Sequence, residues 1–293
     1  MDIMPGFTRI DIDTTGARIC LRHGGSGPPL LLLHGNPLTH VSWHAVAPRL
    51  AEHFHVVAAD LRGYGDSLAP PEAPDHSNYS FRAMARDQVE VMRTLGYDRF
   101  CVAGHDRGGR TTHRMCLDHP DKVIKAAVID IVPTLDMWAA MDKDGAIGGW
   151  HWPFMAQPAD FPERMLGSVP ADWFMRKKLL KLTANLNHIP PAIWDEYVRC
   201  FNEKTIRGSC ADYRAAATID CELDTADLGR KLAMPMLVLW GKNSSVGKRF
   251  ADPLGIWRQR AEDVRGEALP TGHYVNEEAP DQVLDWFMRF FSG

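Results

Sequence analysis

Short, wholly apolar runs separated by helical stretches are the feature that most constrains the fold of this chain. An apolar run without alternation is typical of a strand in a parallel sheet that is covered on both faces. Helical stretches at residues 81–95 and 281–291 predict the right-handed crossovers of an α/β sheet. We expect strands at residues 30–33, 55–59, 100–104, 126–129, 236–240 and, more weakly, 264–269.

The alternation of strands and helices stops between residues 133 and 231. This stretch is rich in Trp, Met and Pro and has amphipathic pieces, which predicts a helical cap. We therefore predict a core at 1–132, a cap at 133–231 and a second part of the core at 232–293. Because ligands bind at the carboxyl ends of parallel strands, such a cap would roof the site. Residues 7–22 alternate with period two around a turn and predict an antiparallel hairpin.

The segment Gly104-His105-Asp106-Arg107-Gly108 lies between a predicted strand and a predicted helix. This is similar to the nucleophile elbow of the α/β-hydrolase fold, a mostly parallel sheet with an inserted cap, except that Asp106 replaces the usual serine. A carboxylate attacks a saturated carbon, expels a leaving group and becomes an ester that water hydrolyses. The alternative is an aspartate that only caps a helix. The strand before and the helix after favour the nucleophile.

His273 and Asp130 are the expected partners of this nucleophile. His273 follows the last predicted strand, where this fold places its general base. The loop after residue 240 has no carboxylate, whereas Asp130 ends the preceding strand and can orient His273. Asp252 is a weaker rival for this role, and the alternative for Asp130 is an aspartate that only ends a strand before a turn. The unperturbed histidine pKa predicts activity that falls below about pH 6.5.

The turn His34-Gly35-Asn36-Pro37 follows the first long apolar strand. The backbone N–H groups of Asn36 and Arg107 are expected to form an oxyanion hole for the charge on the Asp106 ester during its hydrolysis. A lone turn of this kind could be structural, but its place after the strand supports the role.

Composition excludes several classes of function. The net charge of −4 offers no basic face for nucleic acid. The acidic N-terminus is unlike a signal peptide, and no apolar run is long enough to cross a membrane, so we expect a cytoplasmic protein. Six cysteines without CxxC spacing indicate reduced thiols. We expect no metal and no cofactor.

The chain resembles the haloacetate (fluoroacetate) dehalogenases of the α/β-hydrolase fold over nearly its whole length. The resemblance lies at Gly104–Arg110, at His151-Trp152-Pro153-Phe154, at Tyr213, and from Asp263 to Tyr274. It implies hydrolysis of fluoroacetate or chloroacetate to glycolate and halide. It also implies a homodimer, for which the residues give no independent argument.

The family also implies roles for five further side chains. Arg107 and Arg110 share a helix face and would hold the substrate carboxylate. His151, Trp152 and Tyr213 would donate to the departing halide. Without the resemblance, these three are more readily explained as packing residues of the cap.

Three rival functions remain open. An epoxide hydrolase shares the Asp106 chemistry but needs two cap tyrosines, for which Tyr197 and Tyr213 are available. A haloalkane dehalogenase typically has asparagine at the position of Asn36, but tryptophan where this chain has Arg107. A non-catalytic binding protein of this fold would not need a complete set of Asp106, Asp130 and His273.

Overall fold

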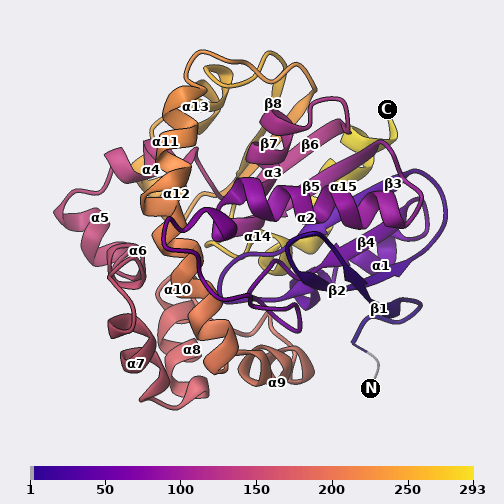
Figure 1. The fold of residues 1–293 in the computed structure, drawn as a ribbon. Helices are drawn as coiled ribbons and strands as arrows, with labels where there is room; N and C mark the ends of the chain where they lie inside the picture. Colours follow the sequence, from indigo (N-terminus) through magenta and orange to yellow (C-terminus); the bar gives the residue numbers. More distant parts are fainter. Residues whose placement is uncertain (1–2) are drawn as a thin grey trace.

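The chain folds around one eight-stranded sheet in the order β1-β2-β4-β3-β5-β6-β7-β8 (Figure 1). The computed structural model describes residues 3–293. The predicted N-terminal hairpin is confirmed, because β1 pairs antiparallel with β2, and β2 in turn pairs antiparallel with β4. All other neighbours in the sheet are parallel. The strands are β1 (Thr8–Asp13), β2 (Arg18–Gly24), β3 (Pro29–Leu33), β4 (His55–Ala59), β5 (Phe100–His105), β6 (Val123–Ile129), β7 (Met236–Gly241) and β8 (Val264–Leu269).

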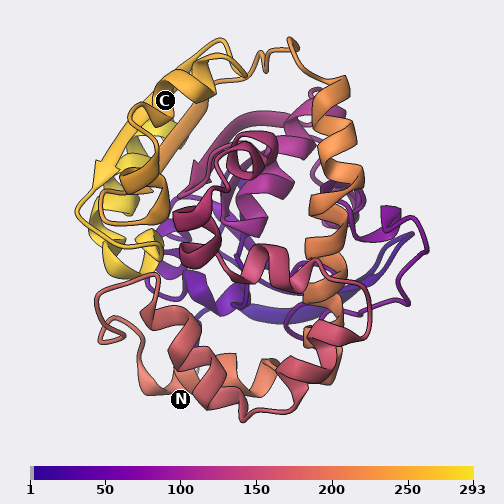
Figure 2. The ribbon, with the colours of Figure 1, turned by 90° about the vertical axis from the view of Figure 1, so that its left-hand side faces the viewer.

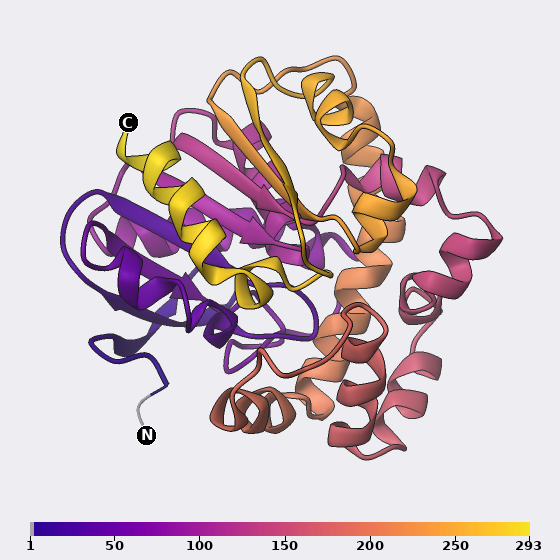
Figure 3. The ribbon, with the colours of Figure 1, turned by 180° about the vertical axis from the view of Figure 1, so that it is seen from behind.

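Helices cover both faces of the sheet, which explains why its central strands lack alternation. One face packs against α2 (Phe81–Thr94), α3 (Arg107–Asp118) and α13 (Pro253–Arg258). The other face packs against α1 (Ala47–Leu50), α14 (Val275–Glu278) and α15 (Pro280–Ser292). Figure 3 shows α15, in yellow, running across this second face. The short helices η1 (His40–Trp43), η2 (Ser77–Tyr79) and α12 (Ser245–Arg249) lie in the loops.

Between β6 and β7 the chain forms the eight helices α4 to α11, which we call the cap. No strand interrupts it within the described residues. The cap stands beside the sheet, and Figure 2 shows its helices in front of the strands. The division at residues 132 and 231 stays a prediction. The cap helices are α4 (Thr134–Ala139), α5 (Lys143–Gly148), α6 (His151–Met155), α7 (Phe161–Gly167), α8 (Ala171–Leu180), α9 (Pro191–Cys200), α10 (Glu203–Ala217) and α11 (Ile219–Ala226).

The cap has its own apolar cluster, which joins it to the loops of the core. Phe174, Tyr197 and Tyr213 are buried in this cluster together with Leu38 and Tyr274 of the core. Burial of an aromatic side chain stabilises a fold by about 1.5–3 kcal/mol, so these contacts fix the cap over the sheet edge. Across residues 3–293, no helix is both long and apolar enough to span a membrane.

Candidate active site

Asp106 stands on a strained turn between β5 and α3. Its φ of 48° lies in the left-handed region that residues other than glycine rarely adopt. Glycines make this turn possible: a Cβ at Gly104 would lie 2.2 Å from the carbonyl oxygen of Gly108, and one at Gly108 would lie 2.4 Å from that of Leu33. Tight packing of strand, turn and helix therefore holds the Asp106 carboxylate at the sheet edge.

His273 joins the carboxylates of Asp106 and Asp130. Its Nε2 lies 3.2 Å from Asp106 Oδ2, and its Nδ1 lies 2.5 Å from Asp130 Oδ2. All three side chains are at least partly buried, at the carboxyl-terminal ends of β5 and β6 and in the loop after β8. The structure thus brings together the three residues that the sequence singled out as nucleophile, base and orienting acid.

The end of β7 and the loop that follows it supply hydrogen-bond donors to Asp130 rather than a carboxylate to His273. Gly241 N donates to Asp130 Oδ1 at 2.9 Å, and Ser244 Oγ donates to the same oxygen at 2.6 Å. The other oxygen of Asp130 remains for His273. The rival Asp252 caps α13 by accepting from Gly255 N, and it makes no contact with His273.

The electrostatics of the site favour an ionised Asp106 beside a protonated His273. Burial alone would raise the pKa of Asp106, but the hydrogen bond and charge of His273 outweigh it and hold that pKa below its usual range. Burial alone would lower the pKa of His273, but its bonds to Asp106 and Asp130 raise it to about 10. The expectation built on an unperturbed histidine near 6.5 is therefore wrong for the free protein.

The loop after β3 passes close to the nucleophile. A Cβ at Gly35 would lie 2.5 Å from Asp106 Cβ, so a side chain there would displace the carboxylate. Residue 107 is the first residue of α3, where backbone N–H groups have no partner within the helix. The predicted oxyanion hole, the N–H groups of Asn36 and Arg107, flanks Asp106 in this arrangement and stays a prediction.

The side chain of Asn36 does not face the nucleophile as a free donor. Its Nδ2 donates to Tyr64 Oη at 3.3 Å and to Ser209 Oγ at 3.1 Å. Its Oδ1 accepts from the ammonium of Lys178, which lies on α8 of the cap. Tyr64 Oη itself donates to Asp212 at 2.5 Å, so the orientation of the Asn36 amide follows from its partners.

Arg107 is paired within the protein. Its Nε donates to Asp212 Oδ2 at 2.7 Å, and its Nη2 donates to the other carboxylate oxygen. Its guanidinium also lies over the rings of Phe81 and Tyr213, 4.6 and 4.2 Å from their centroids. The buried Nη1 has no hydrogen-bond partner among the described residues. Arg107 therefore has only this one nitrogen available, among the described contacts, for the substrate carboxylate that Arg107 and Arg110 were expected to bind.

Arg110 has no carboxylate partner in the described part of the chain. Its Nη1 donates to the carbonyl oxygen of Val132 at 3.0 Å and to Thr134 Oγ1 at 3.2 Å. Its buried Nε is unpaired, and its guanidinium lies 4.6 Å from the ring centroid of Trp152. Burial and the charge of Arg107 lower the pKa of Arg110 to about 10. A bound anion would raise the pKa of Arg110 again, because it would offset both the burial and the charge of Arg107.

A cavity of about 70 Å³ lies next to the triad. Met137 and Met141 of the cap and Val246 of α12 supply apolar wall. Tyr213, Asn36 and Arg107 lie outside this lining, although the Tyr213 ring packs against those of His151 and Trp152 at centroid distances of 5.7 and 5.6 Å. Of the predicted site residues, Asp106, Arg110, Asp130, His151, Trp152 and His273 line the cavity.

The three side chains that are predicted to receive the halide, His151, Trp152 and Tyr213, are uncharged and include an unpaired hydroxyl within the described residues. Burial, followed by the charge of Lys178, holds the pKa of His151 well below its usual value. Burial and the charge of Asp106 raise the pKa of Tyr213. The buried Tyr213 Oη has no partner within residues 3–293. A buried, unpaired hydroxyl is costly, which is consistent with a donor reserved for a ligand.

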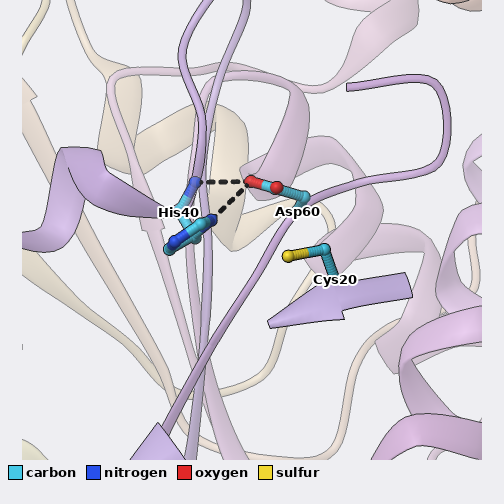
Figure 4. A group of neighbouring side chains, drawn as sticks. All are labelled: Cys20, His40 and Asp60. Atoms are coloured by element: carbon cyan, nitrogen blue, oxygen red, sulfur yellow. Dashed lines mark hydrogen bonds and ion pairs between the residues drawn. The ribbon is translucent and has the colours of Figure 1, made fainter. Parts of the chain in front are cut away.

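Cys20, His40 and Asp60 form a separate buried cluster (Figure 4), whose potential ligand atoms lie within 4.8 Å of one another. Asp60 accepts from the backbone N and ring Nδ1 of His40, at 2.7 and 2.9 Å, and from Asp66 N at 2.9 Å. Burial raises the pKa of the Cys20 thiol to about 12, which disfavours a thiolate ligand. We assign this cluster to the structure of the loops that follow β3 and β4.

Comparisons with known proteins agree with this geometry. The family model of the alpha/beta hydrolase fold matches residues 28–280. A fluoroacetate dehalogenase from Burkholderia sp. is 46% identical over 98% of this chain and 94% of its own length. The chain belongs to the haloacetate dehalogenase family of α/β-hydrolases. The predictions of this fold, of this family and of an enzyme are confirmed.

Other members of the fold are also similar to this chain. A soluble epoxide hydrolase from Corynebacterium sp. (strain C12) is 33% identical over 94% of each chain. A solved α/β-hydrolase-fold protein from Nostoc sp. PCC 7120 is 49% identical, covers 98% of each chain and has a TM-score of 0.95. The choice between a carbon–halogen bond and an epoxide therefore depends on the site.

Two charged residues of the site were missed by the sequence analysis, Asp212 and Lys178. Asp212 precedes Tyr213 on α10, and this adjacency to a predicted site residue was the available signal. Lys178 is buried in α8, where a lysine would normally face solvent, and no sequence pattern marked it.

Proposed function

We propose that this protein hydrolyses a haloacetate, fluoroacetate or chloroacetate, to glycolate and halide through an ester on Asp106. The observation that carries the proposal is the Asp106–His273–Asp130 chain of hydrogen bonds beside an arginine, Arg110, that has no carboxylate partner among the described residues. A carboxylate nucleophile suits attack on saturated carbon, and an unpaired guanidinium suits an anionic substrate. The named relative is a fluoroacetate dehalogenase.

In the first step, an Asp106 oxygen attacks the carbon that carries the halogen. The new C–O bond forms as the C–halogen bond breaks, and the halide leaves with the bonding electron pair. Asp106 is suited to this step because its low pKa keeps it ionised. Arg110 would hold the substrate carboxylate, with the free Nη1 of Arg107 as a second donor. This grip positions the reacting carbon and offsets the repulsion between two anions.

The departing halide would receive hydrogen bonds from His151, Trp152 and Tyr213. All three side chains are donors, and a hydrogen bond to a charged group stabilises by roughly 1.5–3 kcal/mol. Only bonds that strengthen as charge develops on the halogen accelerate the step. This contribution should be largest for fluoride, which leaves carbon most reluctantly.

In the second step, His273 would take a proton from water that attacks the ester carbonyl. Esterification removes the charge of Asp106, one of the two carboxylates that raise the pKa of His273 to about 10. The pKa of His273 therefore falls when the ester forms, the imidazolium releases its proton to solvent, and the neutral imidazole becomes a competent base. The tetrahedral adduct then expels glycolate, which takes the proton from His273, and the remaining proton of the attacking water passes to His273 as Asp106 returns to a carboxylate. Asp130 remains to stabilise the imidazolium.

The two catalytic rivals fit the site less well. An epoxide hydrolase needs two cap tyrosines to protonate the oxygen, but Tyr197 Oη donates to Glu277 at 2.8 Å and is committed there. A haloalkane dehalogenase would use the Asn36 amide as a halide donor, but its Nδ2 is engaged by Tyr64 and Ser209. Neither rival accounts for Arg110.

One substrate panel separates these functions. Fluoroacetate, chloroacetate, a neutral chloroalkane and styrene oxide are each incubated with the purified protein, and halide and diol are measured. We expect halide from the two haloacetates only. Diol from the epoxide, or faster release from the chloroalkane than from chloroacetate, would refute the proposal. No product from any of the four would favour the non-catalytic alternative.

A further inference from the structure

Lys178 places a buried positive charge on the cap side of the site. It lies on α8 and is only 2% exposed. Its charge is the largest electrostatic influence on His151 after burial, and it interacts favourably with Asp106, so it lies within electrostatic reach of both. Its Nζ also lies 5.9 Å from the ring centroid of Tyr213. Lys178 is therefore next to the side chains expected to receive the halide.

The ammonium of Lys178 has donors to spare. Asn36 Oδ1 is its one hydrogen-bond acceptor within residues 3–293, and no described carboxylate lies within ion-pair distance of it. An ammonium has three donors, so two are unused. Burying a cation without a counter-ion is costly, and such a charge is retained where a ligand or a reaction uses it.

The neighbouring side chains fix the direction of this ammonium. The Asn36 amide is held by Tyr64 and Ser209, so its oxygen faces Lys178. Tyr64 in turn donates to Asp212, which pairs with Arg107. This network joins the cap to the elbow helix and leaves Tyr213 Oη and Arg107 Nη1 as further unpaired donors in the same region.

The buried charges near Asp106 show what the lysine could balance. Arg107 is neutralised by Asp212, and Asp130 is bonded to His273. Within residues 3–293, Arg110 and Lys178 are then the buried cations near Asp106 that have no carboxylate in ion-pair contact, and both interact favourably with the charge of Asp106. The substrate brings a second negative charge, for which Arg110 is the counterpart. During the first step, negative charge moves from Asp106 to the halogen. Lys178 is then the cation available to stabilise that charge on the halogen.

We propose that Lys178, oriented by the side-chain amide oxygen of Asn36, is a charged ligand of the departing halide, completing a subsite with His151 and Tyr213. This inference rests on the proposed function. The lysine stays protonated throughout: it donates hydrogen bonds, and the halide departs as an anion. A fixed positive charge nearer to the halogen than to Asp106 stabilises the transition state more than the ground state.

The first test compares Lys178→Met with Lys177→Met, an exposed neighbour on α8. Fluoride holds its charge most compactly, so we expect Lys178→Met to lower kcat for fluoroacetate about 100-fold and for bromoacetate less than tenfold. Lys177→Met should leave both rates unchanged. If the ratio of kcat for fluoroacetate to kcat for bromoacetate were the same in Lys178→Met as in the wild type, the inference would be overturned. The proposed function would still stand, provided that the wild type releases fluoride from fluoroacetate.

The second test is equilibrium chloride binding without substrate, followed by ³⁵Cl line broadening. We expect Lys178→Met to weaken binding at least tenfold. In the wild type, burial lowers the pKa of Lys178 to about 7, so chloride affinity should fall above that pH. The pKa of His273 is raised to about 10 by Asp106 and Asp130, and burial holds the pKa of His151 well below its usual value, so neither group accounts for this transition. The charged or titratable groups that act on Lys178 are Asp106 and Arg107 of the elbow, His151 of α6, and Cys210, Asp212 and Tyr213 of α10.

The chloride measurement does not depend on turnover. If the wild type released no halide from any haloacetate, the proposed function would fail, and this titration would still report whether Lys178 holds an anion. Equal chloride affinity in the wild type and Lys178→Met, with no change between pH 6 and 8.5, would overturn the inference even if the variant lost activity through misfolding.

Discussion

The two sides of the active site are held in different ways. On the core side, backbone geometry fixes Asp106 and Asp130, since both follow parallel strands and both have a positive φ, 48° and 52°. On the cap side, packing between helices fixes Lys178, Asp212 and Tyr213, and their positions depend on side-chain contacts. Under the proposed function, this difference corresponds to a division of roles: the core would make and break bonds, and the cap would select the leaving group.

Removing the nucleophile should have the largest effect. Asp106→Ala should lower kcat on the order of 10⁴-fold or more for every haloacetate, because no other group can form the ester. The measurement is halide release, with Asp121→Ala, an exposed substitution in the turn between α3 and β6, as the control. If Asp106→Ala kept activity within tenfold of the wild type, Asp106 would not be the nucleophile.

Removing the base should separate the two steps. His273→Ala should release about one equivalent of halide and then stop, because the ester forms but water is not activated. Rapid-quench kinetics and intact-protein mass measure the burst and the added ester. His53→Ala, at an exposed position, should turn over normally. Steady turnover by His273→Ala would show that another group is the base.

Removing the unpaired guanidinium should weaken substrate binding. Arg110→Met should raise KM for fluoroacetate roughly 10–100-fold, the value of one or two hydrogen bonds to a charged group. Steady-state kinetics measure this change, and Arg93→Met, exposed on α2, is the matched control. An unchanged KM would show that Arg110 does not bind the substrate carboxylate and would leave Arg107 as the candidate.

Removing the hydroxyl of Tyr213 should have a smaller effect that depends on the halide. Tyr213→Phe keeps the ring over Arg107 but loses the unpaired Oη, so kcat for fluoroacetate should fall about tenfold. The fall for bromoacetate should be smaller. Equal losses for both substrates would contradict the role of the cap in selecting the leaving group.

The pH dependence should differ between the two steps, and this is the smallest effect. Halide formation should stay level from pH 6 down to 5, because the pKa of Asp106 lies below its usual range and Lys178, with a pKa of about 7, is protonated there. Ester hydrolysis needs neutral His273, so its rate should fall as the pH drops below the pKa of His273 in the ester, which lies below the free-protein value of about 10. Single-turnover kinetics at several pH values measure both rates.

The core side could be predicted from the sequence because local chain geometry determines it. Apolar runs located the strands, and Asp106, Asp130 and His273 follow strand ends whose edge is shared in a parallel sheet. Close backbone contacts around Asp106 require glycine, and these glycines can be recognised in the sequence.

The cap side could be predicted only in part. His151, Trp152 and Tyr213 were indicated by family resemblance, whereas Lys178 and Asp212 were not found. Their burial depends on how α8 and α10 pack against the loop with Asn36 and the helix with Arg107, and such contacts between distant segments have no local pattern. The ion pair between Arg107 and Asp212 could not be predicted from the sequence for the same reason.

Isotope labelling tests the central claim, the covalent ester on Asp106, most directly. A single turnover of fluoroacetate with excess protein in H₂¹⁸O is followed by mass spectrometry of the peptide that contains Asp106. We expect ¹⁸O to enter the Asp106 carboxylate, while the first glycolate retains ¹⁶O from the protein. Glycolate labelled in the first turnover, with an unlabelled Asp106 peptide, would mean that water attacks the substrate directly and that no ester forms on Asp106.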